Sequence, residues 1–73
     1  MKLIIKSKNY ITETILTIKC SDIETCFYTV EENRMLLNMH SGRQHHIYKH
    51  DKIFIKNNDQ TTEINLEQIP DYI

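Results

Sequence analysis

Residues 34–50 read RMLLNMHSGRQHHIYKH and begin with the clearest alternation of apolar and polar residues in the chain. Three apolar side chains recur at every second position of its first half, Met35, Leu37 and Met39. That spacing is the period of a strand with one buried face. Gly42, the single glycine of the chain, then supplies the positive φ that a tight turn needs. We therefore predict an antiparallel hairpin made of residues 34–40 and 44–50.

The register of this hairpin depends on its turn, and two registers fit the sequence. With a three-residue turn at residues 41–43, His45 and Ile47 join the methionine face. The opposite face then holds four polar rings, those of His40, His46, Tyr48 and His50. With a two-residue turn at residues 41–42, the sorting reverses and His45 leaves the methionine face. The pattern alone leaves open which of the four histidines are buried.

Strand patterns continue on both sides of the hairpin. Runs rich in β-branched and apolar residues, separated by polar turns, cover residues 2–6, 10–20, 25–30, 52–56 and 60–66. In the longest run the apolar positions change parity near Ile15 and Leu16, which predicts a bend or a bulge. The chain has twelve Ile and no Ala, a composition that favours strands over helices. We expect one helical turn at most, at residues 67–69.

These features predict one small, all-β domain over residues 1–73. Its six or seven short antiparallel strands follow one another as a meander, which either curls into a bent sheet or closes into a small barrel. Closure would hide the strand edges. In an open sheet, the long strand at residues 10–20 is the expected site of pairing with another chain.

A short pattern occurs twice in the chain. Residues 18–23 and residues 64–69 both read apolar, polar, apolar, polar, polar, Ile. We interpret each copy as a strand that ends, turns and returns an isoleucine to the core. Two copies are too few for a repeat protein.

The charges are segregated along the chain, although the net charge is only −1. Residues 34–56 hold five basic residues and one acid, a local +4, whereas residues 57–73 hold four acids and no base. Two interpretations stay open: the two blocks cancel in space, or the basic block binds a phosphate-bearing ligand or nucleic acid. The candidate binding residues are Arg34, Arg43, His46, Tyr48, Lys49 and Lys52.

Several chemistries find little support in the sequence. His46 and His50 lie four strand residues apart, about 13 Å, so they cannot share one metal ion. Cys20 and Cys26 fall on apolar strand faces, which is typical of buried thiols rather than nucleophiles. A single glycine cannot build a phosphate-binding loop. We therefore expect no enzyme, no metal site and no cofactor.

By elimination, we expect a small binding module that binds or inhibits a host macromolecule. A host protein is the first expected partner. The load of Ile, Lys and Asn is typical of an AT-rich genome, such as that of a phage or mobile element. Binding of nucleic acid or a nucleotide through residues 34–56 is the first alternative, and self-assembly through an exposed edge strand is the second. No run approaches a membrane span, and the apolar run at the start is too short for a secretory signal, so we expect a cytoplasmic protein with reduced cysteines.

Overall fold

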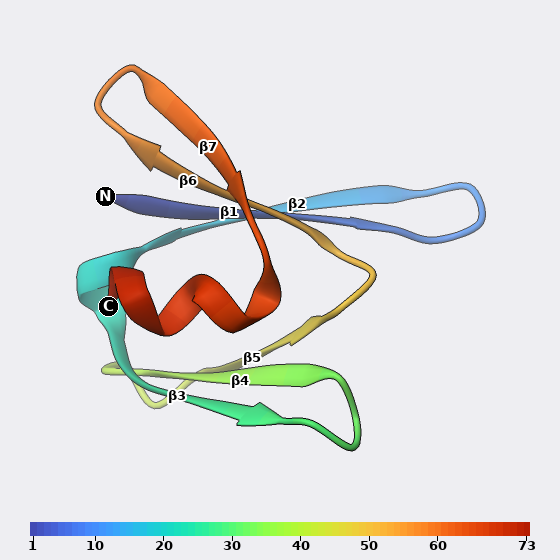
Figure 1. Cartoon of the computed structure of the whole chain (residues 1–73), viewed down its shortest axis with the longest axis horizontal. Helices are drawn as coiled ribbons and strands as arrows, with labels where there is room; N and C mark the ends of the chain where they lie inside the picture. Colours follow the sequence, from blue (N-terminus) through green and yellow to red (C-terminus); the bar gives the residue numbers. More distant parts are fainter.

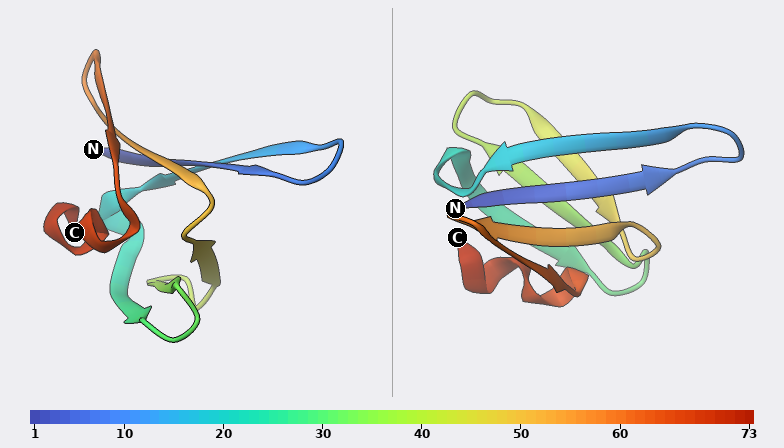
Figure 2. Two further views of the ribbon diagram at one scale, coloured as in Figure 1. Left: turned by 45° about the vertical axis from the view of Figure 1, so that its right-hand side comes forward. Right: turned by 90° about the horizontal axis from the view of Figure 1, so that it is seen from above.

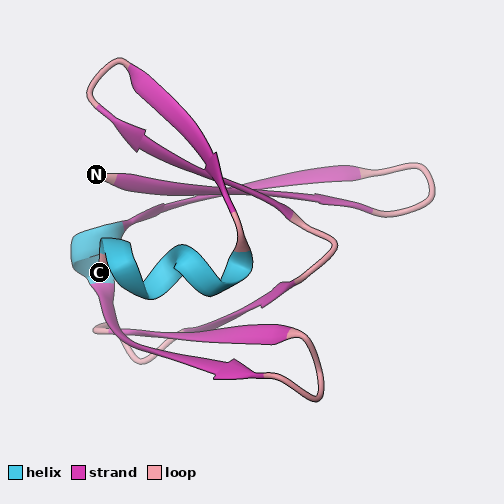
Figure 3. Ribbon diagram, in the orientation of Figure 1, coloured by secondary structure: helices cyan, strands magenta, loops and turns pink.

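The computed structural model describes all 73 residues and is mostly β, as predicted. Seven strands and two short 3-10 helices make up the chain (Figures 1 and 3). Their bounds are β1 (Lys2–Lys8), β2 (Glu13–Lys19), η1 (Cys20–Asp22), β3 (Ile23–Thr29), β4 (Arg34–Met39), β5 (Gln44–Tyr48), β6 (Lys52–Asn57), β7 (Gln60–Ile64) and η2 (Leu66–Tyr72). No helix in the structure could cross a membrane, since even η2 has only seven residues.

The strands form two separate antiparallel sheets. One sheet has four strands in the order β2-β1-β6-β7, and the other has three in the order β3-β4-β5. Only β3-β4-β5 is a meander, and the chain inserts it between the β1–β2 and β6–β7 hairpins, which pair with each other through β1 and β6. Of the two predicted forms, the closed barrel is therefore not the one adopted. The two sheets face each other as layers (Figure 2).

The core fills the space between these two layers. Alternate side chains of the four-stranded sheet point into it, namely Leu3, Ile5, Ile18, Ile53, Ile55 and Ile64. The three-stranded sheet contributes the predicted methionine face and its partner on β5, namely Met35, Leu37, Met39 and Ile47. Helix η2 lies between the sheets at one side and adds Leu66 and Ile69 (Figure 1). Burying these large side chains is the main favourable term for a chain this short.

Both copies of the repeated pattern end a strand of the four-stranded sheet and return an isoleucine to the core, as expected, and each turn is a 3-10 helix. After β2, Ile18 and Cys20 are buried, and Ile23 returns to the core beyond η1. At the second copy, Ile64 is buried at the end of β7, and Leu66 and Ile69 are buried in η2. The expected single turn at residues 67–69 extends over the seven residues of η2. The Asn65 N–H donates to Gln68 Oε1 at 2.7 Å and fixes its start.

In the β4–β5 hairpin, the side chains are distributed over the two faces as the three-residue turn predicts. Leu37 pairs with His45 and Met35 with Ile47, so both β5 residues lie on the methionine face. The turn itself occupies residues 40–42, one position earlier than predicted, because Met39 faces Arg43 and Asn38 faces Gln44, whereas a turn at residues 41–43 would place His40 opposite Gln44. A turn at 40–42 and one at 41–43 differ by an even shift in pairing, which preserves the faces.

Two predictions for the first hairpin are wrong. The expected strand at residues 10–20 begins only at Glu13, because β1 runs on to Lys8 and the chain turns at Asn9, whose N–H donates to Thr12 O at 2.8 Å. Of the bend or bulge expected near Ile15 and Leu16, the bulge is absent, since β1 and β2 pair without a break over seven residues. The change of parity arises because Ile15 is simply an exposed apolar residue on the outer face. The one register shift in the protein lies between Ile23 and Thr25 in β3.

Candidate functional site

Three of the six candidate residues lie together on the outer face of the three-stranded sheet. Arg34 pairs across the strands with Tyr48, and its Nη1 lies 3.3 Å from His46 Nδ1. Arg34 also forms an ion pair with Glu32, so its charge is compensated. The Tyr48 ring stacks on His50, with ring centroids 5.7 Å apart and planes 12° from parallel. This arrangement is ordered but carries little free positive charge.

The other three candidates lie elsewhere. Arg43 follows the β4–β5 turn at the opposite end of the hairpin, and Lys49 lies in the connection between the sheets. Lys52 begins β6 and thus belongs to the four-stranded sheet. The basic block at residues 34–56 is divided because the chain crosses from one sheet to the other at residues 49–51. The structure therefore does not form one continuous basic face from these six residues.

The acidic block does not neutralise the basic block by direct pairing. Arg34 forms an ion pair with Glu32, and His50 lies within 3.5 Å of Asp51, and neither contact involves residues 57–73. Around the start of β6, however, Lys49 and Lys52 line a hollow of about 390 Å³ together with Glu63 and Glu67 of the acidic block. The two blocks therefore lie near each other at this one place without forming an ion pair.

A second charged surface, which the sequence analysis did not predict, is the outer face of the four-stranded sheet. In β1 and β6 the buried residues alternate with outward-pointing ones, and the pairing register aligns lysines across the strands. Lys2 lies opposite both Lys19 on β2 and Lys56 on β6, and Lys6 lies opposite Lys52. We call this surface the lysine face and define it by Lys2, Lys6, Lys8, Lys19, Lys52 and Lys56, six of the nine basic residues.

The lysine face is open and largely uncompensated. No helix or loop covers it, since η2 lies on the inner side of the sheet, and the right panel of Figure 2 looks down on it. None of its lysines forms an ion pair. Its two acids are Glu13, opposite Lys8, and Glu63, opposite Phe54. Like charges directly opposite each other on neighbouring strands destabilise a sheet, so the lysine rows carry an energetic cost within the fold.

An apolar centre separates the two lysine rows. Ile4 and Phe54 form a cross-strand pair between them, and both are partly exposed. Lys6 Nζ lies 5.1 Å from the centre of the Phe54 ring, a cation–π distance. A hollow of about 430 Å³ opens at this end of the face, and its walls are Lys6, Lys8, Glu13, His50, Lys52 and Phe54. The face thus combines cations with one aromatic ring and a shallow recess.

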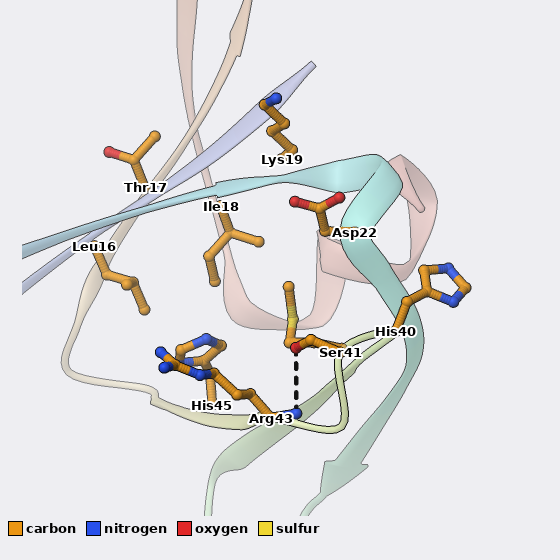
Figure 4. A pocket seen from close by; sticks show the side chains of 10 residues that line it. Leu16, Thr17, Ile18, Lys19, Asp22, His40, Ser41, Arg43 and His45 are labelled. Atoms are coloured by element: carbon orange, nitrogen blue, oxygen red, sulfur yellow. Dashed lines mark hydrogen bonds between the residues drawn. The ribbon is translucent and has the colours of Figure 1, made fainter.

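A groove of about 560 Å³ runs along β2, between this strand and the β4–β5 turn, and Lys19 of the lysine face lies at its rim (Figure 4). Leu16 and Ile18 point into it from β2, and Arg43 and His45 approach from the hairpin. The Arg43 N–H donates to Ser41 Oγ at 3.4 Å and braces the turn. No three His, Cys, Asp or Glu side chains converge here or anywhere else to hold a metal ion.

Both cysteines are free thiols. Burial raises the pKa of Cys20, and the N-terminal ammonium and a backbone hydrogen bond oppose this shift only in part. Burial likewise raises the pKa of Cys26. A raised pKa keeps a thiol protonated at neutral pH, whereas a nucleophilic cysteine needs a lowered one.

The lysine face did leave a signal in the sequence. Residues 2–6 read KLIIK and residues 52–56 read KIFIK, two pentamers with lysines at both ends of an apolar run. Alternation places both lysines of each pentamer on one face. The two pairs of lysines form one surface only because β1 pairs with β6, fifty positions further along the chain. No local sequence pattern indicates this pairing.

Comparison of the chain with protein-family models, with curated proteins and with solved structures found no match.

Proposed function

We propose that this protein is a non-enzymatic binding module and that its lysine face binds single-stranded nucleic acid through the phosphate backbone. The observation that carries the proposal is the pair of lysine rows, Lys19–Lys2–Lys56 and Lys6–Lys52, in which like charges lie opposite each other and no lysine forms an ion pair within the chain. A bound polyanion would remove this repulsion and release counterions.

The shape of the face favours an extended ligand over a small one. The rows lie four residues apart along the strands, about 13 Å, so the charges spread over a surface rather than converge on one point. A small anion is normally held in one concave site, whereas the recess on this face reaches only Lys6, Lys8 and Lys52 and leaves the row Lys19–Lys2–Lys56 outside it. Phe54 and Ile4, in the centre, give a base a surface on which to stack. Lysine heads act as flexible point charges, which suits contact with phosphates without sequence preference.

The cellular setting belongs to the same proposal. Two protonated, unpaired cysteines fit the reducing environment of a cytoplasm. Nucleic acid is abundant there, and a protein with net charge −1 would meet it through its one cationic face rather than through its overall field.

The test is fluorescence anisotropy with a labelled single-stranded oligonucleotide over a range of salt concentrations. Binding should weaken steeply with salt, with a slope of about −0.7 for each phosphate neutralised. The variant Lys2→Gln/Lys56→Gln should bind at least tenfold more weakly. The matched control, Lys49→Gln/Arg43→Gln, removes the same charge away from the lysine face and should bind like the parent protein. Equal losses in both variants, salt-independent binding, or no binding by the folded protein at low salt would contradict the proposal.

A second candidate function is binding of a host protein at the outer face of the three-stranded sheet. Phe27 is 68% exposed there and lies opposite Leu36, which in turn pairs with His46. Hydrogen bonds from Asn38 to Thr25 and from Gln44 to Asn38 order the neighbouring row. An exposed aromatic ring beside a rigid polar rim is the usual anatomy of a protein contact.

Affinity capture from a lysate of the host separates this candidate from the first. A protein partner should be retained by the parent chain and by Lys2→Gln/Lys56→Gln and should be lost from Phe27→Ser. Retention by Phe27→Ser would remove this face from consideration.

A further inference from the structure

The two sheets have four edge strands, and β2 is the only one of them that is both long and regular. β5 and β7 have five residues each, and β3 has seven but contains the register shift near Ile23. β2 has seven residues, contains no proline, and pairs with β1 without a break. Natural proteins protect edges by shortness, bulges or proline, so a long regular edge is open to another strand.

The sequence of β2 is complementary to itself when read antiparallel about its central residue, Leu16. In that register Glu13 of one copy lies opposite Lys19 of the other, at both ends of the strand. Within its own chain Lys19 faces Lys2, a like charge, so the Glu13 of a second copy would supply the anion that it lacks. Ile15, 59% exposed on the outer face, would lie opposite Thr17. Cross-strand pairs of opposite charge stabilise a sheet, whereas like pairs weaken it.

The projecting hairpin has exposed apolar side chains that nothing within the chain covers. The β1–β2 hairpin extends well beyond the body of the molecule (Figure 1), and Tyr10 and Ile11 in its turn are almost fully exposed. In the self-complementary register, Tyr10 and Ile11 of one copy would lie beyond Lys19 of the other, toward η1, whose Asp22 lines one end of the groove. The same arrangement would therefore give the exposed turn a neighbour.

We infer that two copies of this chain associate through antiparallel pairing of β2 with β2 and form a continuous eight-stranded sheet with a twofold axis at Leu16. Such an interface is isologous, since each copy offers Glu13 and receives Lys19. Because the twofold axis is perpendicular to the sheet, both lysine faces lie on the same side of the dimer. The inference goes beyond the proposed function and does not rest on it.

The test is the mass of the untagged protein in solution, measured by light scattering over a wide range of concentration without nucleic acid. The parent chain should reach twice the 8.8 kDa of one chain. Lys19→Glu places a carboxylate opposite Glu13 of the second copy and should halve the mass. It should leave the fold intact, because within the chain it replaces the Lys19–Lys2 repulsion with an attraction. Lys56→Glu makes the same charge change on the other side of Lys2, away from the edge, and should remain a dimer.

Two further measurements test whether β2 pairs with β2 in the register centred on Leu16. The variant Glu13→Lys/Lys19→Glu restores both opposite-charge pairs and should regain the dimer mass. Hydrogen exchange of the parent protein requires no variant: amides on the free side of β2 should be protected at high concentration and should lose protection on dilution. The inference is overturned by a single-chain mass at every concentration, by a dimer that survives Lys19→Glu, by a folded double variant that stays monomeric, or by β2 exchange that does not change on dilution.

Discussion

Asp51 is the only buried polar residue of the protein, and it lies where the chain passes from one sheet to the other. Its Oδ2 accepts the Tyr48 N–H at 2.9 Å, and its own N–H donates to Tyr48 O at 3.0 Å. His50 Nε2 lies 3.5 Å from the second carboxylate oxygen. Asp51 thus closes the four-residue turn that positions β6 after β5. The alternation of apolar and polar residues could not predict the buried position of Asp51, because a residue in a turn does not follow the two-residue period of a strand.

Replacing Asp51 tests this role. Asp51→Ala should lower the free energy of unfolding by about 1–3 kcal/mol, because the partly buried Tyr48 N–H would lose its acceptor. Asp51→Asn keeps an oxygen at the same place and should lose less. Urea denaturation followed by circular dichroism measures both. An alanine variant as stable as the parent would show that the backbone bond from Asp51 N–H to Tyr48 O holds the turn without the side chain.

Among the elements, the β4–β5 hairpin has one feature that the sequence predicts, its buried face, and one that it does not, the position of its turn. Alternation of Met35, Leu37 and Met39 is local, so the buried face of β4 was predictable. The position of the turn was not, because Gly42 can occupy more than one place in a short turn. In the structure Gly42 has φ of +91°, which L-residues with a side chain rarely adopt.

A substitution at Gly42 isolates the energetic contribution of this turn. A Cβ added there would meet no atom within 4 Å, so any loss comes from the backbone and not from a clash. Gly42→Val should cost about 1–3 kcal/mol of unfolding free energy, because a β-branched residue strongly disfavours positive φ. Gly42→Asn should cost less, since asparagine tolerates that region. Equal stability of the valine variant and the parent in thermal melts would mean that the turn adopts another conformation.

At the scale of the whole molecule, the fold class and the core were predictable, and the lysine face was not. Each strand has a local period, and each turn has a polar signature. The pairing of β1 with β6 and the separation into two sheets depend instead on which hairpins meet, and that is decided by packing across the core. The candidate residues were chosen from one continuous basic segment. The structure showed that charge gathers from both ends of the chain, with Lys2 from one hairpin and Lys56 from the other.

The whole protein should lose stability in alkaline solution. Burial raises the pKa of the Cys20 and Cys26 thiols, and partial burial with the nearby Glu67 carboxylate raises the pKa of the Tyr28 hydroxyl. The folded state therefore holds these protons more tightly than the unfolded state. The contribution is complete below the ordinary thiol pKa of about 8.5 and is lost as the pH rises through the raised values. Urea midpoints from neutral pH upward should fall, and Cys20→Ala/Cys26→Ala should flatten the thiol part of the decline. An unchanged slope in that variant would contradict the assignment to the thiols.

The lysine face predicts opposite effects of one substitution on stability and on binding. Lys2 lies between Lys19 and Lys56, so Lys2→Gln removes two like-charge contacts at once. Each such contact costs a few tenths of a kcal/mol, and we expect the variant to be more stable by about 0.2–1 kcal/mol at low salt, with the gain shrinking as salt screens the repulsion. The same variant should bind single-stranded nucleic acid more weakly. Thermal melts and anisotropy on one preparation measure both quantities. If stability rises and the affinity for nucleic acid does not change, the lysine rows destabilise the fold but do not bind this ligand. If stability and affinity both fall, the aliphatic part of Lys2 stabilises the sheet by packing, and the repulsion of its charge is not the dominant effect.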